Sequence, residues 1–306
     1  MRKSDFPEEI QPEMKRALRL EYWTLFWIGS IVVVMYMAMG SSQAMKSAWL
    51  EDLLSLVPAI VFIVAARFER RLPDDKFRYG YSRVNSLAFL IAAVALVSVG
   101  SFLLYESIKA LVMREHPSIG LVSIFGRDIW LGWVMIAALT YSVIPPVILG
   151  HIKQPIAKRM QDKVLHTDAL MQKADWMTGL AGVAGILGVG LGYWWADSAA
   201  SAFISFEILR DGVKNLRTST AELIDGMPRE LDSDDIAHDA RELEAALHAK
   251  FPGAEIRMRE SGRYMLVQIA GIAHDNNIMA GIKPLERPWR LEITSVEIPS
   301  ERTATG

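Results

Sequence analysis

Six apolar runs, each close to the length that a helix needs to cross a bilayer, constrain this sequence more than any other feature. They cover residues 20–39, 44–66, 84–113, 129–150, 164–192 and 198–216. Hydrophobic residues make up 51% of the chain and the mean hydropathy is +0.20, which is too apolar for an ordinary soluble protein of this length. The pattern predicts an α-helical membrane protein with six transmembrane helices in a lipid bilayer.

The last part of the chain is more polar and has mixed periodicity. Residues 232–251 have the spacing of an amphipathic helix, with Leu243 and Leu247 on its apolar face. Strand patterns follow at residues 255–261, 263–272 and 289–298. We therefore expect a cytoplasmic N-terminal segment at residues 1–19, a six-helix transmembrane domain at 20–226 and a small cytoplasmic α+β domain at 227–306.

The positions of lysine and arginine predict the orientation in the membrane. They gather before the first run, between the second and third, and between the fourth and fifth, where Lys153 and Lys163 are among them. The other connections are poor in both residues. Since basic connections stay in the cytoplasm, both termini should be cytoplasmic.

The fifth run is the first place to search for a functional site, because its first half carries Asp168, Lys173 and Asp175. Ionisable groups at membrane depth are unfavourable unless they pair or face water. The chain has no cysteine, so a metal would be held by oxygen, imidazole or thioether groups. Its 33 basic and 35 acidic residues nearly cancel, which gives no reason to expect binding to nucleic acid.

Several motifs occur in a characteristic order: LEDLLSLVPA in the second run, FRYGYSRVNSLA entering the third, TDALMQKADWMTGL in the fifth and WWADSAASAFISFEILRDGVKNL in the sixth. By these motifs the sequence resembles the cation diffusion facilitator family over residues 14–228. The resemblance implies six membrane helices followed by a ferredoxin-like cytoplasmic domain, and assembly as a homodimer. It also implies export of a divalent metal from the cytoplasm, usually in exchange for protons, across a membrane such as the bacterial inner membrane.

The family's usual metal ligands are largely replaced in this sequence. The family pattern has two ligands four residues apart on the second helix, facing a His or Asp and an Asp on the fifth. The matching residues here are Leu54, Pro58, Met171 and Asp175. Only Asp175 keeps a usual ligand type.

Nearby acidic residues suggest that the metal site is displaced. Asp168, Met171 and Asp175 share one helical face by their spacing. The candidate ligands are Asp175, Asp168, Glu51, Asp52 and His166. Such a set would hold a transported Mn²⁺, Fe²⁺, Zn²⁺ or Co²⁺, and its carboxylates favour the harder ions.

Lys173 gives a second reading of the same cluster. A lysine beside buried acids forms charge pairs that fix two helices together without any metal. The alternative function is then a non-transporting membrane subunit with the same fold and a degenerate ion site. The sequence contains no HExxH or nucleophile motif that would indicate an enzyme, and nothing in it calls for a prosthetic group.

Overall fold

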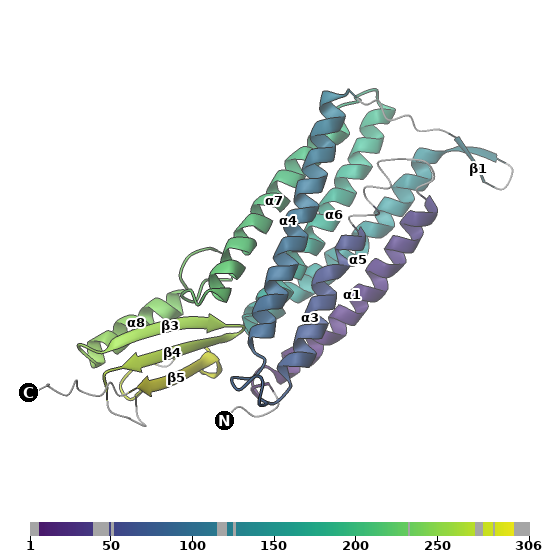
Figure 1. Ribbon diagram of the computed structural model, residues 1–306. Coiled ribbons are helices and arrows are strands. Elements are labelled where there is room, and N and C mark those ends of the chain that lie inside the picture. The colour runs from purple at the N-terminus through teal and green to yellow at the C-terminus, as the bar shows by residue number, and fades with distance from the viewer. Residues whose placement is uncertain are drawn as a thin grey trace, which may run out of the picture.

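The structure, a computed structural model, describes residues 6–38, 49, 52–114, 121–124, 127–231, 233–272, 278–283 and 285–296. Within these ranges six helices lie side by side in an elongated bundle, and a small sheet with one helix lies at one end of it (Figure 1). The bundle helices are α1 (Gln11–Ala38), α3 (Leu56–Glu69), α4 (Arg83–Val112), α5 (Leu131–Met160), α6 (Lys163–Gly190) and α7 (Ala196–Leu223).

Three of the described helices are long and apolar enough to cross a membrane, and these are α1, α4 and α5. Charged and polar residues lower the mean hydropathy of α6 and α7, which belong to the same bundle. The helix α3 has only 14 residues, because a turn at Ser55 separates it from a short helical stretch at residues 52–54. That all six helices cross the bilayer remains a prediction.

The helix α5 is longer than the apolar run that predicted it. It continues through Pro145, Pro146 and Pro155 and ends at Met160. Prolines are tolerated in membrane helices because neighbouring groups satisfy the backbone atoms that they free. Lys153 and Lys163, which the sequence pattern placed in a connection, therefore lie inside helices and are buried. Between the fourth and fifth runs only residues 161–162 lie outside a helix.

A short hairpin that the apolar pattern did not predict precedes α5. Strands β1 (Leu121–Ile124) and β2 (Arg127–Trp130) pair in antiparallel fashion. It projects from the end of the bundle opposite the C-terminal sheet (Figure 1).

The C-terminal part contains α8 (His238–Lys250), β3 (Glu255–Ser261), β4 (Tyr264–Ala270), a 3-10 turn at Pro288–Arg290 and β5 (Leu291–Val296). β4 is the central strand, antiparallel to β3 and parallel to β5. The predicted apolar face of α8 is confirmed, since Leu243 and Leu247 are buried against Val267 and Ile269 of the sheet. The ferredoxin-like assignment and the predicted domain boundaries remain predictions.

The turn between β3 and β4 is inserted among the helix ends. Gly262 donates its backbone N–H to Ser86 Oγ at 2.9 Å, and its φ of +62° favours glycine. A Cβ at this position would lie 2.6 Å from the carbonyl oxygen of Ser82. Only glycine therefore allows this close approach of the turn to the start of α4.

Arg263, the next residue, is fully buried and pairs with Asp162 and Glu69. Burial lowers the pKa of its guanidinium, but the two carboxylates more than compensate, so the net shift is upward. One charged side chain thus joins the sheet to the end of α3 and to the connection between α5 and α6.

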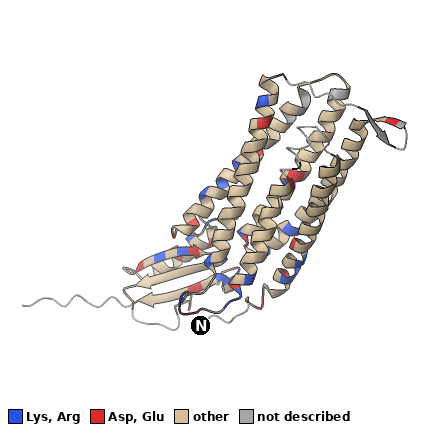
Figure 2. Cartoon of the chain, turned by 45° about the vertical axis from the view of Figure 1, so that its right-hand side comes forward, with Lys and Arg blue, Asp and Glu red and all other residues tan. Residues whose placement is uncertain are grey.

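Charged residues are concentrated at the end of the bundle that adjoins the sheet (Figure 2). The N-terminal end of α1 lies at this same end (Figure 1). Most of the remaining length of the bundle carries few charged side chains, as a membrane environment requires. The few charges inside the bundle are therefore the natural candidates for function.

Candidate functional site

Asp175 is a buried carboxylate on α6, with 9% of its surface exposed. Ser55, at the turn that precedes α3, donates its hydroxyl to Asp175 Oδ1 at 2.6 Å. Asp52, one turn earlier, interacts electrostatically with the same carboxylate. The break in the second helix thus places a hydroxyl and a second carboxylate opposite Asp175.

The neighbouring positions that carry ligands in the family pattern are occupied by apolar packing. Met171 is fully buried, and Leu54 packs against the cluster that contains it, together with Leu96, Val99 and Ile208. A thioether packed among aliphatic side chains offers a hard cation no oxygen ligand. Asp175, Ser55 and Asp52 therefore supply the oxygen atoms of this region among the residues that the structure describes.

The other predicted ligands lie elsewhere or outside the described residues. His166 is buried and borders a pocket of about 290 Å³ between α5 and α6. Lys173 borders the same pocket and is exposed. Glu51 lies outside the described residues. Across the part of the chain that the structure describes, no three His, Cys, Asp or Glu residues form a group that could hold a metal ion.

Asp168 belongs to a separate cluster, in which the cation is Lys153. Lys153 Nζ donates to Asp168 Oδ2, to Glu21 Oε2 at 2.8 Å and to Thr24 Oγ1 at 2.5 Å. The second reading of the sequence paired Lys173 with one of the buried acids, whereas the cation that pairs with Asp168 in the structure is Lys153. The pairing cation comes from α5, and it connects α1 with α6.

The sequence reading missed Lys153, although a signal was available. Lys153, Ile156, Ala157 and Met160 follow helical spacing, and all four are buried. Extending the fourth helix through the prolines would have placed Lys153 on this inward face. Glu21 gave a comparable signal, since it follows helical spacing with Met14, Ala17 and Ile28, which are all buried.

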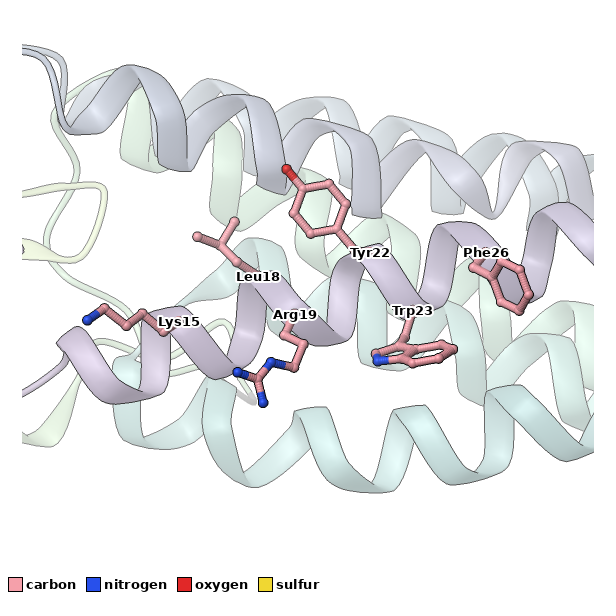
Figure 3. Close-up of a pocket in the computed structure, with 6 residues that line it drawn as sticks. All are labelled: Lys15, Leu18, Arg19, Tyr22, Trp23 and Phe26. Carbon is pink, nitrogen blue, oxygen red and sulfur yellow. The ribbon is translucent and has the colours of Figure 1, made fainter.

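A larger and more open hollow of about 580 Å³ lies along α1 and is lined by Lys15, Leu18, Arg19, Tyr22, Trp23 and Phe26. All six side chains project from this one helix (Figure 3). Basic residues followed by aromatic rings are typical of a helix where it enters a bilayer. We interpret this hollow as part of the lipid interface, separate from the carboxylates inside the bundle.

Carboxylates buried inside a bundle of apolar helices are typical of membrane proteins with an ion or proton pathway. The family model of the cation efflux transmembrane domain matches residues 23–224. The chain therefore belongs to the cation diffusion facilitator family, and it is an integral membrane protein of the cation efflux class.

Known relatives share this region at moderate identity. The chain is 29% identical over 205 residues to the cadmium, cobalt and zinc/H(+)-K(+) antiporter of Bacillus velezensis, covering 64% of this chain and 58% of that protein. It is 23% identical over 223 residues to the zinc transporter ZitB of Escherichia coli, and the match covers 72% of this chain and 67% of that protein. The manganese efflux system protein MneS of Bacillus subtilis is 21% identical over 185 residues, with 60% of each covered. The chain thus spans less than two thirds of the length of the antiporter and of MneS.

Proposed function

We propose that this protein exports a divalent metal cation from the cytoplasm in exchange for protons. The cation would pass between α3 and α6, with Asp175 as the main ligand and Ser55 and Asp52 as further oxygen donors. The observation that carries this proposal is the buried carboxylate of Asp175, which faces a hydroxyl at 2.6 Å. Family membership and relatives named for zinc, cadmium, cobalt and manganese support it.

The donor set favours a relatively hard ion within this group. Carboxylate and hydroxyl oxygens suit Mn²⁺ and Fe²⁺ better than they suit ions that prefer thiolate or imidazole. The proposal also includes Zn²⁺ and Co²⁺ as substrates, whose transport should be compared with that of Mn²⁺ and Fe²⁺. As the family resemblance implies, the proposal includes six membrane spans, a ferredoxin-like cytoplasmic domain, a homodimer in the bacterial inner membrane and cytoplasmic termini.

The test is metal-dependent proton movement in vesicles that contain the purified protein. We expect one or more of Mn²⁺, Fe²⁺, Zn²⁺ and Co²⁺ to move protons in the opposite direction, and Asp175→Asn to abolish this movement. Asp128→Asn is the matched control, because Asp128 is exposed on β2. Flux that persists unchanged in Asp175→Asn would refute the role given to Asp175.

A second candidate function is a non-transporting membrane subunit with the same fold. The apolar packing of Leu54 and Met171 favours it, because it fills the place of the family's ligands. The same vesicles separate the two functions. Absence of flux for every metal, in protein that is folded and inserted, would support the subunit and contradict transport.

A further inference from the structure

Five polar side chains from three helices meet inside the bundle, apart from the Asp175 site. Their exposed fractions are at most 1%. They are Glu21 and Thr24 of α1, Lys153 of α5, and Asp168 and Gln172 of α6. We call these five residues the Lys153 cluster.

The charges in the Lys153 cluster do not balance. Two carboxylates, Glu21 and Asp168, face one ammonium, so with all three ionised the cluster carries one net negative charge. Within the described part of the chain no other Lys or Arg pairs with either carboxylate. An uncompensated charge inside a membrane bundle is unfavourable by several kcal/mol. One further positive charge would therefore stabilise the cluster.

The hydrogen bonds of the Lys153 cluster are also incomplete, and the atoms of the cluster that lack a hydrogen-bond partner are all oxygens. The three hydrogens of the ammonium are used by Glu21, Thr24 and Asp168. Glu21 Oε1, Asp168 Oδ1 and Gln172 Oε1 are buried and have no hydrogen-bond partner. Gln172 Nε2 donates to Asp168 Oδ2 at 3.0 Å and to Thr24 Oγ1 at 3.2 Å, which fixes the amide so that its oxygen is the open atom.

Gln172 connects this interior cluster to a pocket. Gly150, His151, Gln154 and Lys173 are among the residues that line the pocket of about 290 Å³ between α5 and α6. A Cβ added at Gly150 would lie 3.7 Å from Gln172 Oε1. The open oxygen of Gln172 therefore lies close behind Gly150, which lines this pocket.

We propose that the Lys153 cluster binds one alkali cation, K⁺ or Na⁺, through Glu21 Oε1, Asp168 Oδ1 and Gln172 Oε1. Oxygen donors alone select a hard cation. A single positive charge brings the cluster to neutrality, whereas a divalent ion would leave one positive charge in excess. This site is distinct from the metal path at Asp175, and it does not depend on whether the protein transports metal.

The experiment measures the thermal unfolding of the full chain in detergent at constant ionic strength, in chloride salts of K⁺, Na⁺ or N-methyl-D-glucamine. We expect K⁺ or Na⁺ to raise the unfolding temperature saturably, by about 2–4 °C once the ion is at roughly five times its dissociation constant. Glu21→Gln makes the cluster neutral and should abolish the rise. Glu13→Gln is the control, because Glu13 lies on the same helix in a more exposed pair with Arg159.

Each outcome decides for or against the proposal. A rise with an alkali ion in the wild type and Glu13→Gln, but not in Glu21→Gln, supports it. If Glu21→Gln does not fold, Asp168→Asn makes the same change of charge from α6, and saturable one-to-one binding of rubidium to the wild type gives an independent measure. Unfolding that is indifferent to both alkali ions overturns the proposal. A wild type that responds to pH alone, with the response lost in Glu21→Gln, would assign the missing charge to a proton and overturn it equally.

Discussion

Lys153 Nζ lies 2.8 Å from Glu21 Oε2, although the two residues are 132 positions apart in the chain. Both side chains are fully buried. This pair, extended by Asp168, holds α1, α5 and α6 together at a depth where most other side chains are apolar.

Replacing Lys153 should therefore destabilise the protein far more than replacing Lys173. Lys153→Met leaves two buried carboxylates without a counter-charge, and we expect a loss of about 3–5 kcal/mol in the free energy of unfolding. Lys173→Met is the matched control, because Lys173 is exposed, and it should change stability by no more than about 0.5 kcal/mol. Denaturant unfolding in detergent measures both. Equal effects would show that Lys153 is not the compensating cation.

Ser55 tests the geometry proposed for the metal path. Ser55→Ala removes the hydroxyl that lies 2.6 Å from Asp175, and we expect apparent metal affinity to fall about tenfold, which corresponds to about 1.4 kcal/mol. Ser55→Thr keeps the hydroxyl and should restore most of the affinity. The concentration dependence of metal-driven proton flux measures these changes. Unaltered affinity in Ser55→Ala would remove Ser55 from the ligand set.

The turn between β3 and β4 can be tested with two glycines that share a positive φ. Alanine at either Gly262 or Gly253 strains the backbone by about 1–2 kcal/mol. At Gly253 a Cβ meets nothing within 4 Å, whereas at Gly262 it meets the carbonyl of Ser82 at 2.6 Å. We expect only Gly262→Ala to separate the sheet from the helix ends, measured as faster proteolysis of the C-terminal part. Similar cleavage of both variants would contradict this close packing.

Asp225, just beyond α7, gives a stability contribution that depends on pH. Its hydrogen bond from Arg259 and its pair with Arg83 hold the pKa of the carboxyl below its ordinary value of 3.8. Because the folded pKa is depressed, the contribution is fully present above the ordinary value and is lost as pH falls through the folded value. Asp225→Asn tolerates the residue's φ of +63°. The wild type should unfold at higher temperature than Asp225→Asn at neutral pH, and the difference should vanish in strong acid.

The sequence predicted the character of most elements, because apolar length and helical periodicity are local properties. The apolar runs correctly indicated helices in a membrane protein, and the pattern of Leu243 and Leu247 identified the buried face of α8. The order of the motifs identified the family, which the match over residues 23–224 confirms. The ends of helices were less predictable, since α5 continues through three prolines whose consequences depend on neighbouring helices.

Which charged groups meet was decided only by the tertiary structure. Asp168 and Asp175 share a helix and were expected to share a site, yet one pairs with Lys153 of α5 and the other with Ser55 before α3. The sequence placed Lys173 closer to both acids along the chain, but the rotation of α6 turns Lys173 outward. The sequence alone determines which residues carry charge and on which helical face they stand. The partners depend on how the helices pack, because electrostatic pairing acts through space between segments that are distant in the chain.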